Sequence, residues 1–174
     1  MKKTVTLGII LGGIAMLSPT VSLSQTAYGN YKGRLINLTQ SWEGAKACVV
    51  ASGRVNCFDS YAEADKFTGS SDRAQAGTPT TASCTPNGYT YVYEDADFRG
   101  RRLQFRDNGY WQGYDTYGFR NKQSSWSNPR CYSVWLKDID TNPDSYYIEG
   151  ANSSSRNMGS WNNRADEIYL MPNK

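Results

Sequence analysis

The second half of the chain alternates apolar and polar residues with a period of two. Tyr89–Tyr93 and Leu103–Phe105 show this pattern, and glycine, asparagine, aspartate and proline separate the short runs. Such alternation is typical of β-strands with one buried face, and no stretch of this region has a sustained helical period. We therefore predict an all-β domain over residues 84–174, which is large enough for one core.

The region before this domain is organised differently. Residues 48–58 alternate well enough for a β-hairpin that turns at Ser52-Gly53. Residues 59–67 favour one short helix, because Ser60 and Glu63 have capping-box spacing. Small, polar and proline residues dominate positions 69–83, which is typical of a linker. We interpret residues 25–68 as a small N-terminal segment that the linker joins to the β domain.

The first 24 residues have the parts of a secretory signal peptide. Lys2 and Lys3 precede an uncharged apolar run over residues 4–17, and Ser22-Leu23-Ser24 offers a cleavage site. The alternative is a membrane anchor, although the run is short for a span. Without this segment the formal net charge falls from +3 to +1. We therefore expect a secreted protein with no nucleic-acid partner and no membrane contact.

Export makes disulfides the natural state of the four cysteines. Three connectivities are possible, and we favour Cys48–Cys57 across the predicted hairpin and Cys84–Cys131 within the β domain. Another pairing or free thiols is the alternative. No Cys-x-x-Cys sequence occurs, so neither thioredoxin chemistry nor a ribbon-type zinc site is indicated.

The sequence contains no histidine. This excludes Ser-His-Asp and Cys-His catalysis and any histidine-ligated zinc or copper site. A hydrolase would then need a pair of carboxylates, and no pair stands out among the aspartates and glutamates. We therefore predict a binding protein and not an enzyme.

The β domain contains an internal repeat. Tyr93-Glu-Asp95-Ala-Asp97 is echoed 43 residues later, and so is Leu103-Gln-Phe105. Asn121 to Trp126 is echoed after 42 residues by Asn163 to Ile168. Three echoes in one order indicate two copies of a four-stranded unit. Two such units form a β-sandwich, for which Greek-key connections are usual.

The first copy carries an aromatic residue, six further residues and then a glycine, from Tyr93 to Gly100. A tightly folded hairpin needs the glycine for its backbone conformation and the aromatic ring to cover the turn. A later serine, Ser124 or Ser125, could tie the hairpin down by hydrogen bonding, and we select Ser124.

These residues resemble the Greek-key signature of the βγ-crystallin superfamily over residues 84–174. The string from Ser124 to Asn128, with cysteines on either side of the first motif, is similar to secreted bacterial members that include small metalloproteinase inhibitors. The second copy departs from the signature at Leu136 and Pro143. The resemblance implies a two-Greek-key sandwich and a binding function.

The resemblance also implies calcium loops of the pattern (Asn/Asp)-(Asn/Asp)-x-x-(Ser/Thr)-Ser. The first loop begins with Arg120 in place of an acid or amide, and the second has Asp166 and Glu167 in place of the two hydroxyl residues. Calcium prefers six to eight oxygen ligands. The candidate ligands are Asn121, Ser124, Asn163 and Asp166. The alternative is two structural turns.

Two further clusters are candidates for contact with a partner. Arg99, Arg101, Arg102 and Arg106 form a basic run, which we interpret as a solvated hairpin face and not as a polyanion patch. Tyr110, Trp111 and Tyr114 lie in a glycine-rich stretch and are typical of an adaptable binding loop. The alternative is that some of the rings in this stretch belong to the core, because the domain has few leucine, isoleucine and valine residues.

We expect the partner to be an extracellular proteinase, above all a metalloproteinase, that the protein inhibits through a rigid loop. The two candidate loops are Asn108–Gly118 and Thr141–Ser145. The alternatives are a calcium-binding structural or cell-surface module and a glycan-binding or antimicrobial protein.

Overall fold

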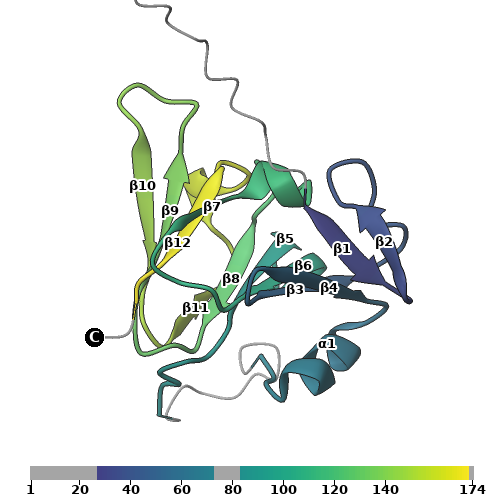
Figure 1. The fold of residues 1–174 in the computed structure, drawn as a ribbon. Coiled ribbons are helices and arrows are strands. Elements are labelled where there is room, and N and C mark those ends of the chain that lie inside the picture. The colour runs from purple at the N-terminus through teal and green to yellow at the C-terminus, as the bar shows by residue number, and fades with distance from the viewer. Residues whose placement is uncertain (1–26, 73–82, 173–174) are drawn as a thin grey trace, which may run out of the picture.

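The computed structural model describes residues 27–72 and 83–172. The predicted signal peptide and most of the predicted linker lie outside the described residues. Within them the chain forms twelve strands in two sheets, one α-helix and two short 3-10 helices, η1 (Tyr114–Tyr117) and η2 (Gly159–Trp161). Figure 1 shows the two sheets, with α1 beneath the larger one. The prediction of an all-β fold with one short helix is confirmed.

The larger sheet has eight strands and the smaller has four. The larger sheet runs, in spatial order, through β11 (Ser153–Ser155), β8 (Ser125–Asn128), β5 (Thr90–Asp95), β6 (Arg99–Phe105), β3 (Ala47–Ala51), β4 (Arg54–Phe58), β1 (Tyr28–Tyr31) and β2 (Arg34–Asn37). The smaller sheet runs through β10 (Ser145–Glu149), β9 (Val134–Asp138), β12 (Glu167–Leu170) and β7 (Trp111–Gly113).

The two predicted repeats of four strands are present. In each repeat the third strand pairs with a strand of the other repeat and not with one of its own. The first repeat is β5 to β8, but β7 pairs with β12. The second repeat is β9 to β12, but β11 pairs with β8. This exchange produces two interlocked Greek keys, so the two-Greek-key sandwich is confirmed.

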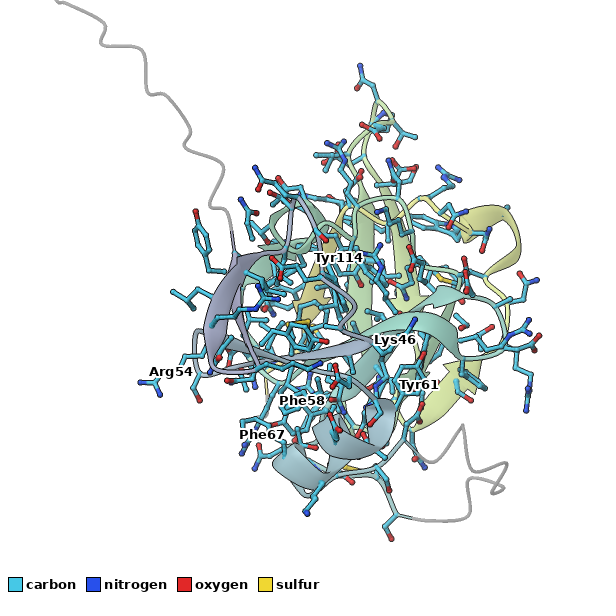
Figure 2. All side chains as sticks on the ribbon, turned by 90° about the vertical axis from the view of Figure 1, so that its right-hand side faces the viewer. Lys46, Arg54, Phe58, Tyr61, Phe67 and Tyr114 are labelled. Atoms are coloured by element: carbon cyan, nitrogen blue, oxygen red, sulfur yellow. A yellow bond between two sulfur atoms is a disulfide. The ribbon has the colours of Figure 1, made fainter. Side chains whose placement is uncertain are left out.

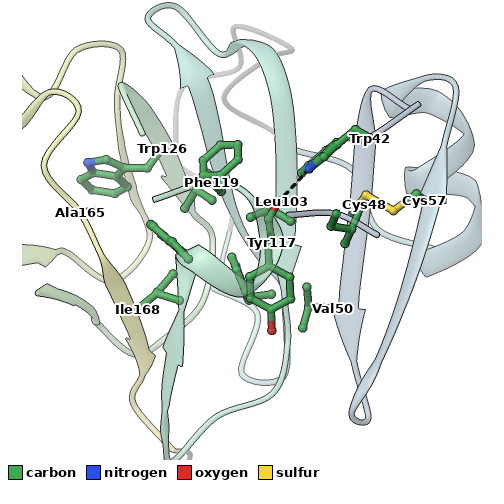
Figure 3. Packing of buried hydrophobic residues seen from close by; sticks show 14 of the residues in the cluster. Trp42, Cys48, Val50, Cys57, Leu103, Tyr117, Phe119, Trp126, Ala165 and Ile168 are labelled. Carbon is green, nitrogen blue, oxygen red and sulfur yellow. Dashed lines mark hydrogen bonds between the residues drawn. A yellow bond between two sulfur atoms is a disulfide. The ribbon is translucent and has the colours of Figure 1, made fainter. Parts of the chain in front are cut away.

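The N-terminal segment is built into the first repeat. Strand β3 pairs in parallel with β6, so the β3–β4 hairpin continues the sheet beyond the first repeat. Trp42 lies in the same core as Phe119, and its indole Nε1 donates a hydrogen bond to the carbonyl oxygen of Tyr117 at 2.8 Å (Figure 3). Gly118 (φ 62°) allows the backbone of the first repeat to lie against the N-terminal segment, since a Cβ there would lie 2.3 Å from the carbonyl oxygen of Leu38.

The predicted helix forms as α1 (Tyr61–Thr68) and covers the other face of the larger sheet. Ser60 accepts the backbone N–H of Glu63 at its N-terminus, which confirms this half of the predicted cap. Ala64 of the helix and Tyr93 of the sheet belong to a second apolar cluster between them. Tyr61 and Phe67 lie on the helix, and Phe58 lies beside it (Figure 2).

This helix overturns part of the prediction for the basic run. Arg99 is exposed, but the Arg102 side chain is fully buried between the sheet and α1. Its Nη2 donates to Asp65 Oδ1 at 2.6 Å, and its guanidinium lies 4.4 Å from the centre of the Tyr61 ring. The prediction of a solvated face was wrong for Arg102 because α1 supplies both a carboxylate and an aromatic cover.

Both predicted disulfides are present. Cys48–Cys57 joins facing positions of β3 and β4. Cys84–Cys131 joins the residues just before and just after the four strands of the first repeat. Two disulfides indicate an oxidising environment. In the described part of the chain, no helix is both long enough and apolar enough to cross a membrane.

Candidate functional site

The hairpin of the first motif has the predicted parts, with one correction. Tyr93 is buried and packs edge-on against Phe98, and Gly100 has a φ of 78°. The serine that ties the hairpin is Ser125 and not Ser124. Ser125 Oγ accepts the Phe98 N–H at 3.0 Å and donates to the Asp95 carbonyl at 2.6 Å. Ser125 can do this because it begins β8, the strand beside β5.

The two motif loops pair with each other reciprocally. The Asn121 N–H donates to the carbonyl of Ala165, and the Asn163 N–H donates to the carbonyl of Gln123. Asn121 and Asn163 both have left-handed backbones, with φ of 55° and 58°. Ser124 Oγ donates to Asn163 Oδ1 at 3.2 Å. A side-chain contact of this kind is typical of structural turns.

Three carboxylates gather where the first loop meets the hairpin of the second repeat. Asp138, Asp140 and Asp166 each place one oxygen within 4.8 Å of the others. Arg120 spans two of them, since its Nε donates to Asp166 Oδ1 and its Nη2 to Asp140 Oδ1, each at 2.6 Å. Arg164 Nε donates to Asp138 Oδ2 at 2.8 Å. Two guanidinium groups thus face the three acids.

This arrangement does not fit a calcium ion. Of the predicted ligands, Asn121 donates its amide N–H to Asp140, and Asp166 is held by Arg120. All six carboxylate oxygens of Asp138, Asp140 and Asp166 already accept hydrogen bonds from N–H groups. The two guanidinium charges also oppose a divalent cation, which needs oxygen lone pairs directed at it. The hydrogen bond to Asp166 also raises the pKa of Arg120, so this guanidinium stays charged.

The predicted partner-binding residues separate into two groups. Tyr110 and Trp111 are 50% and 37% exposed, but Tyr114 is fully buried. Tyr114 donates to Gln123 Oε1 at 2.7 Å and stacks on Phe105 in the core, near the centre of the view in Figure 2. The expectation of a partner contact at Tyr114 is therefore corrected: its glycine-rich stretch forms β7 and η1 and turns this ring inward.

Trp111 is one end of a row that crosses the outer face of the smaller sheet. Strand register places Ile148 opposite Trp135, Trp135 opposite Tyr169, and Tyr169 opposite Trp111. Tyr146 lies beside this row, with ring centres 6.2 Å from Trp111 and 6.4 Å from Trp135. We call the four residues that the register aligns, Ile148, Trp135, Tyr169 and Trp111, the aromatic row. All but Tyr169 are exposed large apolar residues, and Tyr169 is half-buried.

Sequence reasoning found only Trp111 of the aromatic row. The signal was present, because outward positions alternate with inward ones in Val134–Asp138 and in Ser145–Glu149. The register that aligns these residues joins strands from both repeats, and it cannot be read from either strand alone.

Tyr110 and Trp111 also line a groove of about 1070 Å³ beside β7, which is an edge strand of the smaller sheet. The N-terminal segment contributes further lining residues, which include Tyr28, Asn30 and Asn56. The groove and the aromatic row therefore meet at Trp111.

No protein-family model matches this chain, and none of the curated proteins matches it significantly. Solved structures similar to it include the N-terminal domain of protein S, with 19% identity and a TM-score of 0.42 over 49% of this chain and 97% of that one. A variant βγ-crystallin domain from Clostridium beijerinckii has 14% identity and a TM-score of 0.41 over 48% and 97%. The Ca²⁺-bound βγ-crystallin domain of Abundant Perithecial Protein from Neurospora crassa has 9% identity and a TM-score of 0.38 over 53% and 98%.

Proposed function

We propose that this is a secreted, non-enzymatic binding module that takes a neutral polysaccharide across the aromatic row. The observation that supports this function is the register of the smaller sheet, which aligns one large apolar side chain from each of its four strands. Strands lie about 4.8 Å apart, so the row extends roughly 14 Å. This length suits a few linked sugar rings.

The chemistry of the face favours a sugar over other ligands. Sugar rings present C–H groups on their faces and hydroxyl groups at their edges, and aromatic rings cover such C–H faces well. Lys137 and Glu167 lie between Tyr146 and Gly113 in the neighbouring row, and they form an ion pair. The pair offers a donor and an acceptor to hydroxyl groups while leaving the face neutral, which favours an uncharged polymer.

Replacing Trp135 by alanine is expected to reduce retention on the bound polysaccharide at least about tenfold, because central aromatic residues carry most of a binding energy. The measurement is depletion from solution by insoluble chitin and cellulose, which are uncharged, with the unmodified chain as reference. Phe67→Ala is the matched control, since Phe67 is 56% exposed but lies on α1.

Retention of the unmodified chain on neither of these polymers would contradict the proposal. Equal loss in Trp135→Ala and Phe67→Ala would also contradict it. Concentration-dependent dimerisation that Trp135→Ala abolishes would identify a second copy of the chain as the occupant of this face.

Inhibition of a proteinase is a second candidate, favoured by the hairpin between β9 and β10. Its tip, Asn142 to Asp144, is exposed and projects from the body of the molecule (Figure 1). Thr141 Oγ1 braces the base through the Asp138 carbonyl at 3.2 Å and Ser145 Oγ at 3.0 Å. A braced loop loses little entropy when it enters a cleft.

This candidate predicts that the purified protein inhibits at least one secreted metalloproteinase at stoichiometric concentration. The measurement is a titration against secreted metallo-, serine and cysteine proteinases with peptide substrates. Inserting two glycines beside Pro143 should weaken inhibition because the tip would lose its bracing. Absence of inhibition in all three classes would eliminate this candidate and leave the polysaccharide proposal untouched.

A further inference from the structure

The second motif loop replaces a hydroxyl residue by an acid at Asp166, and this acid has a structural task. Asp166 is 2% exposed, and its Oδ2 accepts the backbone N–H of Ile139 at 2.8 Å. Ser125 performs the same task in the first repeat, where it accepts the N–H of Phe98. Each residue thus ties down the hairpin of its own repeat. Asp166 differs because it brings a negative charge into a buried position.

A buried carboxylate needs a positive partner, since burial without one costs several kcal/mol. The need is greater here because Asp138 and Asp140 lie within the same 4.8 Å cluster. Arg120 supplies the charge from the other repeat, and it is the residue that departs from the first loop pattern. The two residues that depart from the calcium-loop pattern, Arg120 and Asp166, therefore form one ion pair with each other.

We propose that Arg120 is a built-in cation that takes the place of calcium between the two repeats. The guanidinium joins the first loop to the second hairpin through Asp140 and to the second loop through Asp166. A metal ion bound by both repeats would make the same connection. A guanidinium is always charged and presents its N–H groups in a fixed fork, so this link persists whatever the calcium concentration.

We expect calcium to leave the thermal stability of the unmodified chain unchanged and to raise that of the Arg120→Gln variant. Adding about 5 mM CaCl₂, above the range of weak extracellular calcium modules, should leave the Tm of the unmodified chain unchanged relative to EDTA. Arg120→Gln should lower the Tm in EDTA by roughly 3–10 °C, because Asp166 loses its partner. CaCl₂ should then restore part of this loss by binding the freed carboxylates, and NaCl of equal ionic strength should not.

Arg156→Gln is the matched control, because Arg156 is exposed and its ion pair with Asp97 is long, at 3.5 Å. This variant should behave as the unmodified chain does. A saturable rise in the Tm of the unmodified chain with calcium would overturn the proposal. So would an Arg120→Gln variant that is as stable as Arg156→Gln, or one that calcium does not stabilise.

Discussion

Replacing Arg102 by alanine is expected to lower the free energy of unfolding by about 3–5 kcal/mol, the usual cost of breaking a buried ion pair. Arg102 is fully buried, and α1 contacts it through Asp65, the Tyr61 carbonyl and the Tyr61 ring. Its removal leaves Asp65 without its cation and opens a void beneath the helix. Urea denaturation of the two chains measures the difference.

Arg99→Ala is the control, since Arg99 lies three residues away on the same strand and is exposed. It makes a 3.6 Å ion pair with Asp97 and a 3.4 Å hydrogen bond to the Ala96 carbonyl. Exposed pairs of this kind contribute at most about 1 kcal/mol. Arg102→Met keeps much of the side-chain volume, so it separates loss of charge from loss of packing. A cost in Arg102→Ala no larger than that in Arg99→Ala would show that α1 does not depend on this contact.

The local parts of the fold could be predicted because they depend on neighbouring residues. A two-residue turn at Ser52-Gly53 sets the register of β3 and β4, and this register places Cys48 opposite Cys57. The same holds for α1, which Ser60 caps, and for the repeat, whose echoes reflect strands that occupy equivalent places.

The parallel pairing of β3 with β6 could not be predicted, because it joins residues more than fifty positions apart. Nothing near Arg102 in the sequence indicates that a helix from the N-terminal segment will cover it. The candidate site likewise has a part that the sequence predicts and a part that it does not. The sequence identified Arg120 and Asp166 as departures from a pattern, but only the folded chain shows that they pair with each other.

The second large effect concerns pH, through the buried carboxyl of Glu149. Burial raises the pKa of Glu149 to about 8, from an ordinary value of 4.5. Gln123 Nε2 donates to Glu149 Oε1 at 2.6 Å, and the hydrogen bonds from Gln123 and Thr90 lower the pKa by less than burial raises it. The carboxyl is therefore protonated in the folded protein at neutral pH and ionised in the unfolded chain.

Folding consequently takes up a proton between these two pKa values, so stability must fall as the pH rises through that window. Relative to Glu149→Gln, the unmodified chain is expected to lose about 1.4 kcal/mol of unfolding free energy for each pH unit between roughly 5 and 8. The difference should be constant below and above this range. Urea denaturation at a series of pH values measures it.

Glu149→Leu distinguishes ionisation from hydrogen bonding. It removes the same titrating group, so its pH profile should be parallel to that of Glu149→Gln. Its stability should be lower throughout, because Gln123 Nε2 loses its acceptor and a buried donor without a partner costs about 1–3 kcal/mol. If the unmodified chain and both variants instead had parallel profiles, Glu149 would be ionised to the same extent in the folded and unfolded states. Burial at the end of β10 would then not control its charge.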